Sequence, residues 1–174
     1  MILGIDPGPE KSGWAEYDPV TRALEAGVET NEALLGRITR FKRWMMPGPP
    51  SMLAIELVAS YGMPVGVTVF ETCQWAGQFI HCWRPFPAKG LYRMDVKMAL
   101  CKSPRAKDTN IRQAIIDRFG PGKAKAVGVK KDQGPLYGIK RDAWQALAVA
   151  LTIADQLSAV AEPTERVRVA GGKA

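Results

Sequence analysis

Three carboxylates stand inside segments of the sequence that are otherwise apolar. Asp6 ends the apolar run at residues 1–5, Glu56 interrupts a later one, and Asp142 opens a long apolar stretch near the end of the chain. A carboxylate at the end of a buried strand is costly unless it is paired. Two interpretations of Asp6 stay open: it accepts hydrogen bonds from the amides of the following turn, or it binds a metal. Taken together, the three acids predict a carboxylate cluster.

Such a cluster predicts a cofactor of a particular kind. Oxygen ligands suit Mg²⁺ or Mn²⁺, and one or two carboxylates per ion suffice when a substrate phosphate supplies the rest. A pair of these ions activates a water and stabilises the leaving oxygen in phosphodiester cleavage. We therefore expect Mg²⁺ or Mn²⁺, with two ions bound, and a phosphodiester as the substrate.

The basic residues of the chain are gathered in one segment. The chain of 174 residues has a net charge of +7 and a pI of about 9.5. Residues 101–144 hold eleven Lys and Arg against four acids, so this segment carries a charge equal to that of the whole chain. A solubilising surface is one explanation. The clustering of positive charge in one segment favours a second explanation, a nucleic-acid partner that is bound through its phosphates.

The apolar periodicity predicts a mixed α/β fold that positions these groups. A hairpin, a third strand, a helix and a further strand precede a series of helices, which favours a mixed sheet of about five strands flanked by helices. We expect one domain over 1–162 and a disordered tail over 163–174. The predicted strands are 1–6, 13–17, 21–28, 52–58 and 90–94; the predicted helices are 32–45, 65–82, 96–101, 109–119 and 141–159; and 120–138 is predicted to be an exposed, mobile loop.

The cysteines and the lengths of the apolar runs argue against several other classes of protein. The cysteines Cys73, Cys82 and Cys101 are odd in number and form no CxxC pair, which argues against a zinc site or a disulfide framework and for a reducing compartment. No apolar run reaches transmembrane length, and the first residues lack the layout of a signal peptide. We expect a cytoplasmic protein that does not contact a membrane. His81, the only histidine, is expected to be structural or exposed.

Four short motifs together resemble one known family. ILGIDPG at 2–8, LAIELV at 53–58, VKMAL at 96–100 and DAWQALAVAL at 142–151 are similar, in this order, to motifs of the RuvC-type Holliday junction resolvases of the RNase H-like superfamily. The resemblance covers roughly residues 1–160. It implies an RNase H-like fold, and the short length of the chain is compatible with a phage-encoded member.

The resemblance also implies a role for individual residues. It makes Asp6, Glu56 and Asp142 catalytic metal ligands and places Lys97 near the scissile phosphate, with Lys107 a less secure second lysine. The chain departs from the family at the second metal-binding position of the last motif, where Gln145 stands in place of an acid. Gln145 could bind the metal through its amide oxygen or hold a water of the site. Asp132, in the basic segment, is an alternative source of the missing carboxylate.

The implied function is metal-dependent resolution of four-way (Holliday) DNA junctions by paired phosphodiester cleavage. A nearly two-fold symmetric junction favours a homodimer, with the helix at 65–82 as the candidate interface. Tyr61 is expected either to stack on a base or to pack in its turn. Two alternatives stay open: a nuclease of this fold acting on other branched DNA or on hybrids, and a junction-binding protein with impaired cleavage. The residues expected to contact DNA, besides Tyr61, are Lys102, Arg105, Lys107, Lys130, Lys131 and Lys140.

Overall fold

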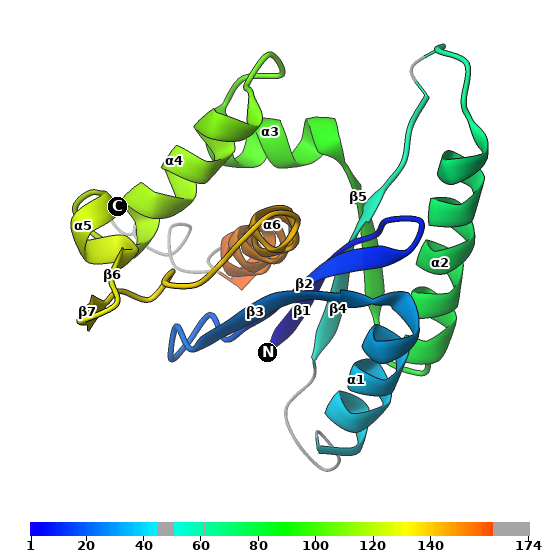
Figure 1. Cartoon of the computed structure of the whole chain (residues 1–174), viewed down its shortest axis with the longest axis horizontal. Coiled ribbons are helices and arrows are strands. Elements are labelled where there is room, and N and C mark those ends of the chain that lie inside the picture. Colours follow the sequence, from blue (N-terminus) through cyan, green and yellow to red (C-terminus); the bar gives the residue numbers. More distant parts are fainter. Residues whose placement is uncertain (45–50, 61, 162–174) are drawn as a thin grey trace, which may run out of the picture.

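A five-stranded mixed sheet forms the centre of the protein, with helices on both faces (Figure 1). The computed structural model describes residues 1–44, 51–60 and 62–161. The first three strands form an antiparallel meander, and the last two run parallel to the first, in the order β3-β2-β1-β4-β5. The predicted fold class is confirmed. The strands are β1 (Ile2–Asp6), β2 (Lys11–Tyr17), β3 (Leu24–Thr30), β4 (Met52–Leu57) and β5 (Ala88–Tyr92).

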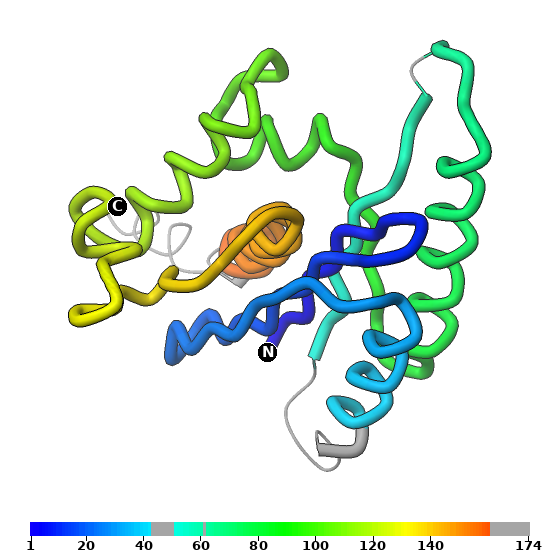
Figure 2. Tube along the Cα trace, viewed as in Figure 1, coloured from blue at the N-terminus to red at the C-terminus, as the bar shows by residue number. Residues whose placement is uncertain are grey.

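The helices divide between the two faces of the sheet. Two helices, α1 (Asn31–Trp44) and α2 (Val67–Trp83), cover one face, and α6 (Ala143–Ala161) crosses the other. The chain between β5 and α6 curves around the outer side of α6, as the tube in Figure 2 shows. That segment contains α3 (Arg93–Cys101), α4 (Asp108–Phe119), α5 (Lys123–Ala126), β6 (Gly128–Val129) and β7 (Asp132–Gln133).

β1 is apolar up to its last residue, Asp6, because both of its faces are buried. Leu3 and Ile5 pack with Phe79 and Trp83 in the core beneath α1 and α2. Ile2 belongs to the second core, which α6 shares with α3 and α4. A strand with two buried faces needs a continuous apolar run rather than an alternating pattern. The apolar run at the start of the sequence thus marks the central strand, and Asp6 is the residue at which that strand leaves the core.

The last helix is apolar for the same reason. By length and composition α6 is the one helix of the described residues that could span a membrane, over Ala143–Val160, but 61% of that stretch is buried inside the protein. Its residues Ala146, Leu147 and Ala150 are fully buried against the sheet. Burial in the core accounts for its composition.

The structure corrects one prediction of local structure. Residues 120–138 were expected to form an exposed loop, yet they contain α5 and the β6–β7 hairpin. Ala126 and Leu136 are fully buried in the core below α4, and Gly128 adopts a positive φ of 71° that allows the tight turn into the hairpin. Because the segment is rich in Gly and Lys, its sequence gives little indication that Ala126 and Leu136 are buried. The expected tail at 163–174 lies outside the described residues.

Candidate active site

Asp6 and Glu56 lie side by side because their strands are parallel and in register. Ile5 pairs with Ile55, so the next residue of each strand, Asp6 and Glu56, reaches the same edge of the sheet. Both residues line one cleft of about 210 Å³, together with Arg93 and the chain that follows β4. We call this the acid cleft. Two carboxylates 50 positions apart in the sequence therefore share one site.

Two glycines bring Asp142 to the same edge. A Cβ atom on Gly13 would lie 2.3 Å from the carbonyl oxygen of Asp142, and one on Gly4 would lie 2.1 Å from the carbonyl oxygen of Ala146. Only glycine lets the backbone of α6 approach β1 and β2 so closely. Gly13 pairs with Asp6 across the hairpin. The first turn of α6, which begins at the carbonyl of Asp142, is thus seated over the end of β1.

The electrostatics of Asp6 reflect the acids near it. Burial and the charges of Glu56 and Asp142 together raise the pKa of Asp6 to about 8, against the opposing charge of Arg93. Like charges close together disfavour ionisation of each. Asp6 is therefore a carboxyl that a nearby cation would ionise, which is the behaviour expected of a metal ligand.

Glu56 faces two cations from one helix. Burial raises the pKa of Glu56, while Arg93 and Lys97 act in the opposite direction. Arg93 and Lys97 are four residues apart on α3 and therefore lie on the same helical face. Lys97 thus lies near Glu56 and is partly buried, while its predicted role at the scissile phosphate stays a prediction.

Sequence reasoning missed Arg93 and Asp108. The Arg93 guanidinium donates to the Glu56 carboxylate at 3.0 Å and to the Asp108 carboxylate at 2.5 Å. A signal for Arg93 was present: it directly follows β5, a parallel neighbour of β4, so it leaves the sheet at the same edge as Glu56. Asp108 carried no such signal, because only the turn between α3 and α4 brings it back to this edge.

Gln145 lies one helical turn after Asp142 and presents an unusual oxygen. Its Oε1 atom is buried and accepts no hydrogen bond from any described residue. A buried acceptor without a partner is costly, and a bound cation or its water would satisfy it. The alternative that Asp132 supplies the missing carboxylate is wrong. Asp132 lies in the exposed strand β7, far across the molecule from the β1–β2 turn (Figure 1). The acids that act on Asp6 are Glu56, Asp142 and Asp108.

The residues present fit Mg²⁺ or Mn²⁺ by chemistry, although they do not yet converge. Carboxylate and amide oxygens are the donors that these ions take, and the raised pKa of Asp6 and the orphaned Gln145 oxygen both favour a cation here. Within 1–44, 51–60 and 62–161, no group of three His, Cys, Asp or Glu side chains is close enough to hold an ion as it stands. The Arg93 guanidinium holds Glu56 in this arrangement.

The residues expected to contact DNA are exposed where the structure describes them. Two other basic residues have structural roles, since Arg112 stacks on Trp144 and Arg118 pairs with Asp155. Tyr61 lies outside the described residues. We call Lys102–Arg141 the basic arm. Its exposed members predicted to bind DNA are Lys102, Arg105, Lys107, Lys130, Lys131 and Lys140.

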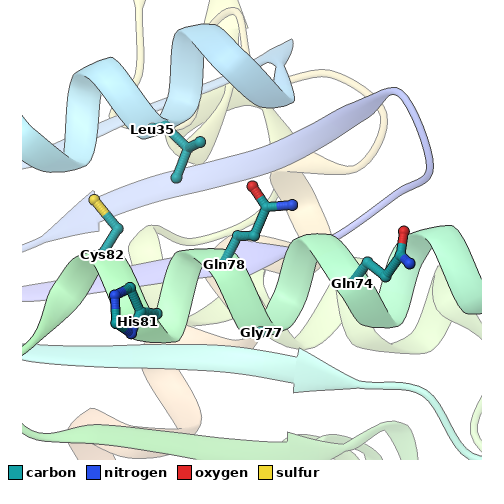
Figure 3. A pocket seen from close by; sticks show the side chains of 6 residues that line it. All are labelled: Leu35, Gln74, Gly77, Gln78, His81 and Cys82. Carbon is teal, nitrogen blue, oxygen red and sulfur yellow. The ribbon is translucent and has the colours of Figure 1, made fainter.

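A second and larger cavity lies on the opposite face of the sheet. It occupies about 740 Å³ between α1 and α2 and is lined by Leu35, Cys82 and the exposed His81, among others (Figure 3). No carboxylate lines it. Beside it, α2 exposes Val67 (72%) and Phe70 (60%), although the helix buries Phe79 and Trp83 on its inner face. Val67 and Phe70 therefore form an apolar spot near the start of α2 that no described residue covers, next to exposed polar residues such as Glu71 and Gln74.

Comparison with known proteins places this geometry in a known fold. No protein-family model matches the sequence, and no curated protein sequence matches it significantly. A solved structure of RuvC from Thermus thermophilus matches with a TM-score of 0.61 at 20% identity, covering 91% of this chain and 96% of the other. The chain has the RuvC fold. The structure of T. thermophilus RuvC in complex with Holliday junction substrate matches this RuvC fold with a TM-score of 0.58 at 18% identity, covering 91% and 95%.

Proposed function

We propose that this protein is a divalent-metal-dependent endonuclease that resolves four-way DNA junctions by paired cleavage. The observation that carries the proposal is the partly buried pair Asp6 and Glu56 at one edge of a RuvC fold, with the pKa of Asp6 raised to about 8. The similar RuvC of T. thermophilus has a structure in complex with Holliday junction substrate, which favours branched DNA as the ligand of this chain too.

Each residue of the acid cleft has a proposed role. Asp6, Glu56 and Asp142 would hold Mg²⁺ or Mn²⁺, and the Gln145 amide oxygen would complete the site. Two bound ions would supply Lewis acidity for activating a water and stabilising the leaving oxygen. Lys97 would stabilise negative charge that develops on the phosphate, as a preorganised cation does.

The basic arm would hold the arms of the junction. Its exposed lysines neutralise phosphates without reading sequence, which suits a substrate defined by shape. The acid cleft alone would repel DNA, so the arm also offsets the charge of Asp6, Glu56, Asp142 and Asp108. The basic arm follows α3, whose first residue, Arg93, lines the acid cleft, and the arm continues around α6 (Figure 1).

Paired cuts require two active sites, and we propose a homodimer formed through α2. Val67 and Phe70 offer exposed apolar surface beside the α1–α2 cavity. A dimer with two-fold symmetry would present two copies of the acid cleft to a junction that is itself nearly two-fold symmetric. Sedimentation of the full chain at micromolar concentration tests this point, since Phe70→Glu should convert a dimer into a monomer.

The function is tested with a labelled four-way junction beside a linear duplex, a Y-fork and an RNA–DNA hybrid, in Mg²⁺, Mn²⁺ and EDTA. Symmetric nicks in the junction alone, only with metal, are the expected result. Cleavage of the fork or the hybrid at an equal rate would instead favour a nuclease with a broader substrate class. Absence of cleavage on every substrate would contradict the proposal.

One observation favours a second candidate function, a junction-binding protein with impaired cleavage. Gln145 supplies a neutral oxygen where the resembled family has an acid, and Arg93 already neutralises Glu56. Tight junction binding without cleavage in either metal would support this candidate. Gln145→Asp should then introduce cleavage, whereas in an active enzyme it should change the rate modestly. A cytoplasmic location and a phage origin stay predictions.

A further inference from the structure

Arg93 joins three elements at the mouth of the acid cleft. One nitrogen of its guanidinium, Nη1, lies 3.0 Å from Oε2 of Glu56, and the other, Nη2, lies 2.5 Å from Oδ1 of Asp108. Arg93 is the first residue of α3, and Asp108 is the first residue of α4. The planar fork of arginine allows one side chain to bridge two carboxylates in this way.

The two partners of Arg93 differ in exposure. The Glu56 side chain is 15% exposed, whereas the Asp108 side chain is 67% exposed. Arg93 itself is 23% exposed and lines the same cleft as Asp6 and Glu56. Burial alone would lower the pKa of Arg93, but Glu56 and Asp108 outweigh it and raise that pKa, so the charge is fixed. The guanidinium thus sits between an inner, site-forming carboxylate and an outer one.

A purely structural ion pair would not need the outer partner. Glu56 already has a second cation nearby in Lys97, and Asp108 at the surface gains little from a solvent-exposed pair. What Asp108 does provide is a second partner for Arg93 when Glu56 is engaged elsewhere. An arginine that keeps one partner can release the other without leaving its own charge unpaired and partly buried.

We propose that Arg93 is a positioning residue that holds Glu56 in the metal-free protein and releases it to a divalent cation, while Asp108 keeps Arg93 at the mouth of the cleft. This inference rests on the proposed metal site. Arg93 competes with the cation for the Glu56 carboxylate, and Asp108 weakens that competition by drawing Arg93 outward. The affinity of the cleft for metal is therefore set by residues that are not themselves ligands.

The proposal predicts a specific pattern of Mn²⁺ affinity in the full-length protein without DNA. Arg93→Gln removes the competitor and should tighten binding ~10-fold, and Asp108→Asn should weaken it by a similar factor, within the range of coupling between linked sites. Loss of a positive charge in Arg93→Gln and of a negative charge in Asp108→Asn would by themselves change the Mn²⁺ affinity in these same two directions. The distinguishing result is the double variant: once Arg93 is absent, Asp108→Asn should change the affinity less than ~2-fold.

The experiment measures free Mn²⁺ by electron paramagnetic resonance, or heat by titration calorimetry, at constant pH and ionic strength. Asp117→Asn is the matched control, because it removes the same charge from the same helix, α4, at an exposed position. It should leave the affinity within ~2-fold of the unmodified protein. Circular dichroism checks that each variant is folded. If Arg93→Gln does not fold, Arg93→Lys keeps the charge without the fork and should reduce the effect of Asp108→Asn.

The outcomes separate this inference from the function on which it rests. If Asp108→Asn weakens Mn²⁺ binding equally with and without Arg93, or if Arg93→Gln weakens it, the inference is wrong while the metal site stands. If the unmodified protein binds no Mn²⁺ that Asp6→Asn abolishes, the proposed metal site fails and this inference fails with it.

Discussion

The acid cleft and the basic arm are built in opposite ways. Strand register places Asp6 and Glu56 side by side in the cleft, and two close glycine contacts bring Asp142 to the same edge of the sheet. The arm draws its charges from one continuous segment and leaves most of them at the surface. Buried carboxylates depend on exact placement, whereas exposed lysines act largely through total charge. The cleft should therefore be intolerant of small changes and the arm tolerant of them.

The largest effect is expected where the cleft depends on close approach. Gly13→Ala would place a Cβ 2.3 Å from the carbonyl oxygen of Asp142 and push α6 away from β2. We expect a loss of about 1–3 kcal/mol in the free energy of unfolding. We also expect at least ~100-fold slower junction cleavage, since a displacement of about 1 Å can cost this much. Urea denaturation and single-turnover cleavage measure the two effects.

Gly36→Ala is the matched control for this substitution. Gly36 lies in α1, and its nearest potential Cβ contact is an ordinary 3.6 Å from the Arg40 side chain. Alanine should leave cleavage unchanged and stabilise the helix by up to about 1 kcal/mol. Equal damage from Gly13→Ala and Gly36→Ala would contradict the claim that α6 is seated by a glycine contact.

A smaller effect is expected on the pH dependence of stability. The pKa of Asp6 is raised from 3.8 to about 8 in the folded protein, so between these values the folded state holds a proton that the unfolded state has released. Folding stability should therefore fall as pH rises from about 4 to about 8 in EDTA. The Asp6→Asn variant has no titratable group at this position, so its free energy of unfolding should not fall with pH for this reason.

The free energy of unfolding of Asp6→Asn, compared with the unmodified protein, measures that penalty. The variant should gain at least about 1.4 kcal/mol at pH 8 relative to pH 4, the equivalent of one pKa unit. Asp117→Asn, at the surface of α4, should show no such gain. A stability difference independent of pH would mean that Asp6 is ionised in the folded protein without metal.

The smallest effect is expected in the arm. Removing Lys130 and Lys131 together should weaken junction binding by roughly 10-fold or less and reduce the salt dependence of the affinity by about 2 in slope. Removing two positive charges elsewhere, at Arg40 and Lys89, is the matched control and should leave the slope nearly unchanged. Fluorescence anisotropy over a series of salt concentrations gives both slopes. An unchanged slope for the Lys130 and Lys131 variant would place the β6–β7 hairpin outside the DNA-binding surface.

The same contrast explains what the sequence could predict. Asp6 and Glu56 were predictable because an acid that ends a buried apolar strand stands out, and parallel strands end at the same edge. Asp142 was predictable as an acid at the start of a core helix, although nothing in the sequence revealed how closely Gly4 and Gly13 admit that helix. The same apolar runs indicated the neighbouring strands β1 and β4 of the sheet.

Arg93 and Asp108 were not predicted, because basic and acidic residues outside apolar runs carry no signal of burial, and the position of Arg93 directly after β5 indicates only the edge at which it leaves the sheet. Their meeting depends on the turn between α3 and α4, which tertiary packing determines. The β6–β7 hairpin was mistaken for a loop for a related reason. The hairpin itself is exposed, and the surrounding segment is anchored by two buried apolar residues, Ala126 before it and Leu136 after it, within an otherwise polar composition.

The central claim is that Asp6 serves chemistry rather than folding or DNA binding. The most direct test compares the unmodified protein and Asp6→Asn on a four-way junction in Mn²⁺, measuring cleavage in single turnover and affinity by gel shift in EDTA. We predict that cleavage falls at least ~100-fold, the scale of losing one catalytic stabilising group. Affinity in EDTA near neutral pH should be unchanged, because an Asp6 whose pKa is raised to about 8 is mostly protonated there without metal. Loss of binding together with cleavage, or cleavage that persists, would contradict the account.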